Sequence, residues 1–261
     1  MEARFGIDQP PKRVAVITGA SRGIGRATAR SLALAGMRVF LVADGTEQEL
    51  QAAAAECTAA HPEETEARYG VFDLARAEAA PAIIDAVLGT YGRVDVLVSN
   101  AGIRIRRAFS DFTPDEFDRI VAINVRAGFL LSQAALPAMR KAGGGRIIFM
   151  ASQLGIVADP GATLYGMTKA ALIHLARSLA LELAADNITV NAVSPGPIAT
   201  EYYEQRLQRE PELLQRRLEA IPLKRLGRAE EVAELVTFLA TTSATFIHGA
   251  NVVIDGGFII R

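Results

Sequence analysis

Cysteine and histidine are scarce in this chain of 261 residues, and their scarcity excludes several kinds of site. Cys57 is the only cysteine, so the chain can form neither an internal disulfide nor a metal cluster held by cysteines. The three histidines, His61, His174 and His248, stand far apart along the sequence without the spacing of metal ligands. We therefore expect no metal site.

An excess of charge of either sign is also lacking, because 28 Lys and Arg oppose 29 Asp and Glu. A nearly neutral chain has no global basic field that would attract nucleic acid or an anionic membrane, and we predict neither partner. The first twelve residues lack the apolar core of a signal peptide, and no uninterrupted apolar run is long enough to span a bilayer. These absences favour a cytoplasmic protein.

The most informative stretch that is present runs from Val14 to Gly25, with the sequence VAVITGASRGIG. Its apolar start predicts a buried parallel strand, and Arg26 to Ala35 has the apolar spacing of a helix. Gly19, Gly23 and Gly25 lie at the turn, where they let an anionic ligand approach the backbone and the first N–H groups of the helix. The turn is therefore a candidate diphosphate site, and a purely structural role for the glycines is the alternative.

Strand and helix patterns alternate along the rest of the chain. The predicted strands are residues 14–17, 38–43, 66–72, 94–99, 145–151, 189–194 and 251–254, and the predicted helices are 26–35, 47–60, 77–91, 114–141, 164–184 and 230–240. This alternation predicts an α/β protein, a single-domain Rossmann fold over residues 1–261 whose doubly wound parallel sheet has helices on both faces. Residues 197–224, rich in Glu, Arg, Gln and Leu, are predicted to form a helical lid over the substrate.

Residues able to carry chemistry follow the predicted strands. Asn100-Ala101-Gly102 follows the fourth strand, and Ser152 follows the fifth. Thirteen residues after that serine comes Tyr165, with Lys169 four residues later on the same helical face. Ligands of such sheets bind beyond the carboxyl ends of the strands, so we expect these side chains to meet there.

Taken together, these motifs resemble the short-chain dehydrogenase/reductase family. The resemblance rests on TGASRGIG (Thr18 to Gly25), Asp73-Leu74, NAG (Asn100 to Gly102), Asn124, Ser152, YGMTK (Tyr165 to Lys169), PGPIAT (Pro195 to Thr200) and IDGG (Ile254 to Gly257). It implies a Rossmann fold, NAD(P)-dependent interconversion of an alcohol and a carbonyl, and a homotetramer. Ser99 departs from the pattern, because the family often has a second asparagine there, and the local hydrogen bonding is left open.

The reaction requires a proton to leave or join the substrate oxygen near neutral pH. A free tyrosine, with a pKa of about 10, is a poor base under those conditions. The ammonium of Lys169, together with the positive nicotinamide of the oxidised cofactor, would lower the pKa of Tyr165, which is the predicted acid/base. Ser152 is predicted to donate a hydrogen bond to the substrate oxygen. By resemblance Asn124 supports a water that connects Lys169 to solvent, and a helix asparagine bonded to backbone is the alternative.

The predicted cofactor site comprises Gly19, Ser21, Arg22, Gly23, Ile24, Gly25, Asp44, Asp73, Leu74, Asn100, Ala101, Gly102, Tyr165, Lys169, Pro195, Gly196, Ile198 and Thr200. Asp44, after the second strand, can bind the ribose hydroxyls of NAD and repel the 2′-phosphate of NADP. Arg22 argues for NADP, and Asp44 lies one place beyond the commonest acidic position, which Ala43 occupies. We predict NAD, because an arginine can turn into solvent whereas a carboxylate facing a phosphate must be neutralised or displaced.

The substrate is less constrained by the sequence. Candidate lining residues are Arg104, Arg106, Arg107, Gln153, Leu154, Tyr202 and Tyr203, which suit a small polar substrate such as a sugar, polyol or hydroxy acid. The arginines could face an anionic substrate or belong to a solvated loop. One alternative is a 3-oxoacyl thioester reductase that uses NADPH. A non-catalytic nucleotide-binding redox sensor is another, which the presence of Ser152, Tyr165 and Lys169 together disfavours.

Overall fold

The computed structural model describes residues 12–60, 67–201, 203 and 211–260, and its centre is a parallel sheet of seven strands. The strands lie in the order β3-β2-β1-β4-β5-β6-β9, and each neighbouring pair is parallel. They are β1 (Val14–Thr18), β2 (Arg38–Ala43), β3 (Arg68–Val71), β4 (Val96–Ser99), β5 (Gly145–Met150), β6 (Ile188–Pro195) and β9 (Asn251–Ile254). The order reverses at β1 and β4, and such a reversal opens a crevice at the carboxyl ends of the strands.

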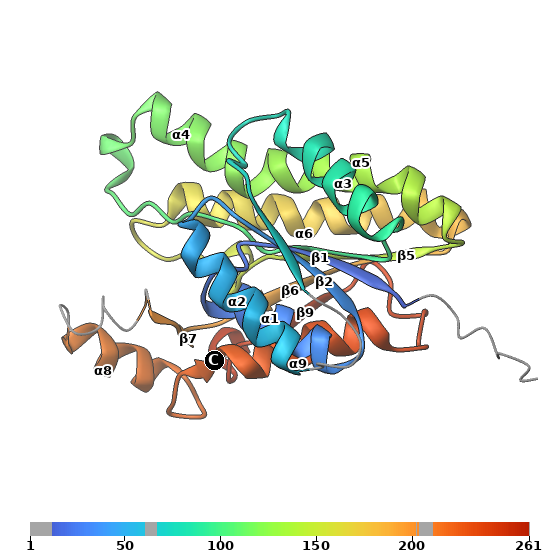
Figure 1. Cartoon of the computed structure of the whole chain (residues 1–261). Coiled ribbons are helices and arrows are strands. Elements are labelled where there is room, and N and C mark those ends of the chain that lie inside the picture. Colours follow the sequence, from blue (N-terminus) through green and yellow to red (C-terminus); the bar gives the residue numbers. More distant parts are fainter. Residues whose placement is uncertain (1–11, 61–66, 202, 204–210, 261) are drawn as a thin grey trace, which may run out of the picture.

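Helices cover both faces of the sheet (Figure 1). One face packs against α1 (Gly23–Leu34), α2 (Glu47–Ala60) and α9 (Ala229–Thr241), and the other against α3 (Ala79–Tyr91), α5 (Ala127–Lys141) and α6 (Thr163–Leu183). Strand residues alternate between the two cores: Val14 and Val16 belong to one, Ala15 and Ile17 to the other. The predicted doubly wound α/β Rossmann fold is confirmed.

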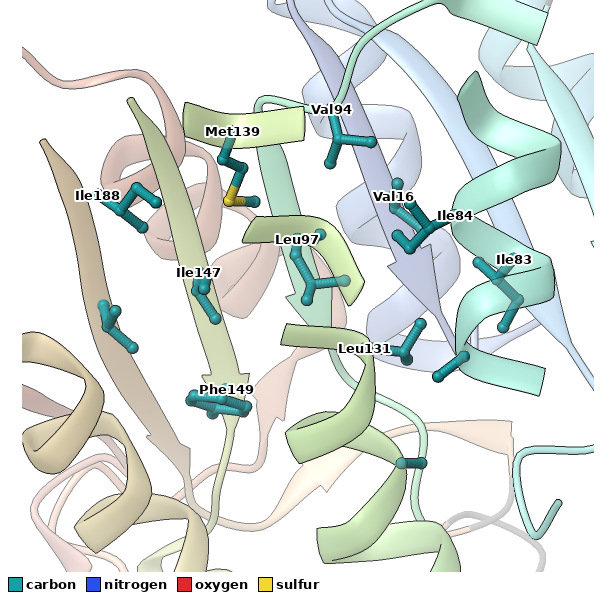
Figure 2. Close-up of a cluster of buried hydrophobic side chains, with 14 of the residues drawn as sticks. Val16, Ile83, Ile84, Val94, Leu97, Leu131, Met139, Ile147, Phe149 and Ile188 are labelled. Atoms are coloured by element: carbon teal, nitrogen blue, oxygen red, sulfur yellow. The ribbon is translucent and has the colours of Figure 1, made fainter. Parts of the chain in front are cut away.

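One of the two cores is shown in Figure 2, where side chains of β1, β4 and β5 meet those of α3 and α5. Leu97, Ile147, Ile83, Leu131 and Met139 are fully buried there. Each such side chain contributes about 1.5–3 kcal/mol through its removal from water. This packing holds the strands rigidly, and the loops at their carboxyl ends are positioned by it.

The predicted helix over residues 114–141 is continuous but not uniform. It consists of α4 (Pro114–Val121), a π-helical turn (η2, Ala122–Arg126) and α5. Thr113 begins it with a capping box, because its side chain accepts a hydrogen bond from the Glu116 N–H and the Glu116 side chain accepts one from the Thr113 N–H. The spacing of apolar residues along the sequence predicts a helix here but does not indicate the π-helical turn.

Length and composition alone would allow this helix to cross a membrane, since its most apolar window has a mean hydropathy of 1.4. Half of that window is buried inside the fold, where α5 packs against α3 and the sheet. A helix buried in the core of a fold passes the same test.

The remaining elements are short and lie mostly around the carboxyl ends of the strands. They are η1 (Phe109–Asp111), η3 (Gln153–Gly155), η4 (Ala184–Asp186), β7 (Ile198–Ala199), α8 (Pro211–Ala220), β8 (Gly227–Arg228) and η5 (Phe258–Ile260). β7 and β8 form a small parallel sheet of their own. The predicted lid contains β7 and α8, while residues 202 and 204–210 of it lie outside the described residues. Residue 66, where the third strand was expected to start, also lies outside them, and β3 begins at Arg68.

Candidate active site

A cavity of about 710 Å³ lies beyond the carboxyl ends of the central strands. Its volume is in the range of small-molecule and cofactor sites. Seventeen of the eighteen predicted cofactor residues line this cavity, all except Asp73: Gly19, Ser21, Arg22, Gly23, Ile24, Gly25, Asp44, Leu74, Asn100, Ala101, Gly102, Tyr165, Lys169, Pro195, Gly196, Ile198 and Thr200. Of the predicted catalytic residues, Ser152, Tyr165 and Lys169 line the cavity and Asn124 lies behind its wall.

The glycine turn after β1 has the geometry that an anionic ligand requires. A Cβ on Gly25 would lie 2.0 Å from the Gly19 carbonyl oxygen, so only glycine allows this close approach of the turn to α1. Arg22 precedes α1 in an extended conformation without capping it through its side chain, and the first turn of α1 holds no acidic residue. The N–H groups at this helix start therefore face the cavity without a competing carboxylate on their own helix, which fits a diphosphate.

Hydrogen bonds join this turn to the loop after β4. The Thr18 hydroxyl oxygen accepts hydrogen bonds from the N–H groups of Asn100 and Ala101, both at 3.0 Å. The Asn100 side chain donates in return to the Thr18 carbonyl at 2.9 Å. Two loops 80 residues apart in sequence thus form one rigid wall. Thr18 was predicted only as part of a motif, because its hydrogen-bond partners are brought to it by the β1–β4 pairing.

Acidic and basic side chains both line the part of the cavity next to the carboxyl end of β2. Asp44 and Arg22 both line the cavity and both are exposed to solvent. Glu49, which the sequence analysis missed, lines it as well, and its carboxylate lies 2.9 Å from where a Cβ on Gly45 would be. Asp73 is exposed and its carboxylate accepts a hydrogen bond from the Ala75 N–H at 2.9 Å. This end of the cavity therefore carries two carboxylates and one arginine.

Asn124 lies in the π-helical turn and is buried. Its Oδ1 accepts a hydrogen bond from the Ile103 N–H at 2.8 Å, and its Nδ2 donates to the Ile103 carbonyl and to the Thr168 hydroxyl, both at 3.0 Å. A Cβ on Gly102 would lie 3.3 Å from Asn124 Oδ1 and 3.4 Å from Lys169 Nζ. Asn124 thus bonds to backbone, though to a distant loop rather than its own helix, and it holds that loop beside Lys169.

Burial governs the ionisation of Lys169 and Tyr165. Lys169 is 3% exposed, and its burial lowers the pKa of the ammonium to about 8. Its Nζ donates a hydrogen bond to the Met150 carbonyl at 2.7 Å. Burial raises the pKa of Tyr165, against the charge of Arg104 and a hydrogen bond with Ser152, which both lower it. Ser152 Oγ also accepts a hydrogen bond from the Leu154 N–H at 3.2 Å.

The charge beside Tyr165 differs from the sequence-based expectation. The expectation assigned the lowering of the Tyr165 pKa to Lys169, whose Nζ lies 5.6 Å from the centre of the tyrosine ring. Arg104 Cζ lies at 5.2 Å, and its charge is the one that favours the tyrosinate in the structure. The charge beside Tyr165 differs from the expected one because Lys169 Nζ donates its hydrogen bond to the Met150 carbonyl, whereas Arg104 extends from the loop after β4 toward the tyrosine ring.

The candidate substrate residues fall into two groups. Arg104, Gln153, Leu154 and Tyr203 line the cavity, whereas Arg106 and Arg107 are not among its lining residues and Tyr202 lies outside the described residues. Arg107 forms an exposed ion pair with Glu116 at 2.6 Å. Arg217 of α8 lines the cavity and was not predicted from the sequence, because only the fold brings it to Asp159 in the loop after β5.

Comparison with known proteins gives consistent matches over nearly the whole chain. A family model described as enoyl-(acyl carrier protein) reductase matches residues 19–259. The oxidoreductase UcpA of Salmonella typhimurium is 39% identical over 256 residues, which cover 94% of each chain. The 3-oxoacyl-(acyl-carrier-protein) reductase of Synechocystis sp. is 37% identical over 249 residues, covering 95% of this chain and 97% of that one. The crystal structure of a protein from Agrobacterium tumefaciens with bound NADP matches this chain with a TM-score of 0.85 and 32% sequence identity. The match covers 95% of this chain and 97% of that one.

Proposed function

The chain belongs to the short-chain dehydrogenase/reductase family of oxidoreductases, and we propose that it interconverts a secondary alcohol and a ketone on a small polar substrate with NAD as its cofactor. The substrate classes that we propose are sugars, polyols and hydroxy acids. The observation that carries the proposal is that Ser152, Tyr165 and Lys169 line the same cavity as the glycine turn. The hydride carrier would therefore lie at the substrate carbon, and the proton carrier at the oxygen bonded to that carbon.

The residues of the cavity fit a nicotinamide dinucleotide. The glycine turn and the start of α1 would hold the diphosphate, and the loops containing Asn100 and Ile198 would hold the nicotinamide end. When bound, the nicotinamide ring supplies the chemistry of accepting or giving a hydride. Leu74 lines the cavity, and Asp73 precedes it in the sequence. We propose that this pair contacts the adenine.

Tyr165 is the acid/base in this proposal, because its hydroxyl can exchange a proton with the substrate oxygen. Ser152 donates a hydrogen bond to the same oxygen and holds it at the tyrosine. Lys169 supplies positive charge and, by family resemblance, a contact to the ribose. The hydrogen bonds of Asn124 fix the backbone of Ile103 beside Lys169. We propose that a water at Asn124 also connects Lys169 to solvent for proton exchange.

We propose NAD rather than NADP because Asp44 and Glu49 both line the end of the cavity after β2. A ribose hydroxyl bonded to a carboxylate contributes roughly 1.5–3 kcal/mol, which a 2′-phosphate could not reproduce. Arg22 and the relative that holds NADP favour the other cofactor. Preference for NAD in kcat/KM should be about tenfold or greater.

Replacing Asp44 tests this preference. Asp44→Ser should weaken NAD binding and raise NADP activity, since it removes the repulsion and leaves Arg22 available to a phosphate. Glu47→Ser is the matched control, because Glu47 is exposed nearby but does not line the cavity. The kcat/KM ratio of the two cofactors is measured for each variant. An equal or better use of NADP by the wild type would show that Arg22 dominates.

A 3-oxoacyl thioester reductase using NADPH is the second candidate, favoured by the Synechocystis relative. A panel of polyols, hydroxy acids and 3-oxoacyl thioesters, assayed by nicotinamide absorbance with each cofactor, separates the two. We expect turnover of hydroxy compounds with NAD. Turnover of the thioesters alone, with NADPH, would replace the first proposal by the second. We also propose a homotetramer that works in the cytoplasm.

A further inference from the structure

Two cations lie beside the aromatic ring of Tyr165, and they come from different elements. Lys169 lies one turn further along α6, with its Nζ 5.6 Å from the centre of the ring. Arg104 comes from the loop after β4, and its Cζ lies 5.2 Å from the same point. Both side chains line the cavity. The acid/base of the proposed reaction thus has a second cation that its own helix does not supply.

The two cations respond differently to pH. Burial lowers the pKa of the Lys169 ammonium to about 8, so its charge is lost as the pH rises through that value. A guanidinium, with a pKa above about 12, keeps its charge throughout the pH range in which enzymes work. Arg104 therefore supplies a positive charge beside Tyr165 that persists where the charge of Lys169 disappears.

Other charged groups surround Arg104. Asp159, in the loop before α6, forms an ion pair with Arg104 at 3.6 Å and a closer one with Arg217 at 2.8 Å. Glu201 is a further carboxylate that lines the cavity. With these groups in place, the charge of Arg104 still lowers the pKa of Tyr165. The effect depends on the short distance between the guanidinium and the ring, because electrostatic interactions weaken with distance.

The position of Arg104 is fixed at both ends of its side chain. The Asn124 side chain bonds both the N–H and the carbonyl of Ile103, the residue before Arg104. At the other end, Asp159 pairs with the guanidinium, and the arginine side chain is only 22% exposed. A charge that is already held in place costs no rearrangement when a proton moves nearby.

We propose that Arg104 is a second electrostatic group of the acid/base centre, which favours the tyrosinate of Tyr165, and that Asp159 is its positioning residue. The proposal rests on the proposed function. When an alcohol is oxidised, the tyrosinate takes the proton of the substrate hydroxyl, so oxidation needs the ionised form. Arg104 acts through Tyr165, and its main effect is therefore on the pH dependence of the reaction.

The pH dependence of oxidation tests the proposal. At saturating NAD, kcat/KM for the polyol or hydroxy acid that the wild type oxidises fastest should rise with pH to a plateau. In Arg104→Gln the midpoint of this rise should move upward by about one unit or more, because the neutral amide does not favour the tyrosinate. Arg107→Gln, which removes an exposed guanidinium paired with Glu116, should keep the wild-type midpoint. An unchanged midpoint in Arg104→Gln would overturn the proposal.

A conservative variant separates charge from structure. Arg104→Lys keeps a positive charge, so its midpoint should lie closer to that of the wild type than the midpoint of Arg104→Gln does. A purely structural arginine would instead lower kcat/KM equally at every pH in both variants. That result, or equal midpoints in the two variants, would contradict the proposal.

Ionisation of Tyr165 provides a readout that does not depend on turnover. The ultraviolet absorbance of tyrosinate is followed against pH in the enzyme–NAD complex, and the signal of the matching Tyr165→Phe variant is subtracted. The midpoint should be higher in Arg104→Gln than with Arg104 present. Such a shift upholds the role of Arg104 even if the wild type oxidises no compound of the panel, in which case only the proposed reaction fails. Equal midpoints, or no ionisation of Tyr165 in either protein, would overturn it.

Discussion

Burial of the Lys169 ammonium costs the folded protein free energy. The pKa falls from 10.5 to about 8, which corresponds to about 3 kcal/mol at neutral pH. Because the folded pKa lies below the unfolded one, this penalty is absent above pH 10.5, grows as the pH falls toward 8, and is complete below it. The protein is therefore less stable at neutral pH because it keeps the positive charge of Lys169 at the reacting centre.

Lys169→Met tests this effect of the buried charge. At pH 7 the variant should unfold at a temperature equal to or above that of the wild type, because relief of the penalty offsets the hydrogen bond lost at the Met150 carbonyl, about 1–3 kcal/mol. Turnover should fall at the same time. Scanning calorimetry and steady-state assays measure the two effects. A clear fall in the unfolding temperature would show that the ammonium stabilises the fold.

The residues of the site differ in how far the sequence could predict them. Tyr165 and Lys169 were predicted because helical spacing puts them on one face and because they belong to a set of motifs that resembles one family. Arg217 and Asp159 were not, because they lie 58 residues apart and meet only through the fold. Glu49 was hidden for a similar reason, since the helical spacing of α2 does not indicate which residue approaches the glycine turn.

At the scale of the element, the start of α1 depends on Gly25. Gly25→Ala would put a Cβ 2.0 Å from the Gly19 carbonyl, so the turn must shift and nucleotide binding should weaken by about tenfold or more. Gly89→Ala is the matched control, because a Cβ there meets nothing within 4 Å and alanine favours the helix. Calorimetric titration with NADH compares them. Unchanged binding by Gly25→Ala would show that the close approach is not needed.

The helix over residues 114–141 shows what sequence patterns could and could not predict for an element. Thr113 and Pro114 marked its start, because the cap and first-turn preferences are local. The π-helical turn at Asn124 was not predicted, because it accompanies hydrogen bonds to Ile103 and Thr168, which are distant in sequence. π-helical turns often occur at functional sites, and this one lies behind Lys169.

At the scale of the whole molecule, an apolar surface over α4, α5 and α6 supports the proposed tetramer. Val121, Val125, Phe129 and Leu175 line a shallow groove there, and Phe129 is 46% exposed. Light scattering at micromolar concentration should give four times the chain mass of 27.8 kDa. Phe129→Glu should lower the mass. A wild-type monomer would contradict the proposal.

The layered fold was predictable because strand and helix alternation and the burial of both sheet faces follow from local patterns. The chemistry assigned to that fold is tested most directly at Tyr165. Tyr165→Phe removes only the hydroxyl, so NADH should bind with a Kd near that of the wild type while turnover falls about 10²-fold or more. Tyr69→Phe, on β3, serves as the control. Turnover by Tyr165→Phe comparable to that of the wild type would contradict the assignment of Tyr165 as the acid/base.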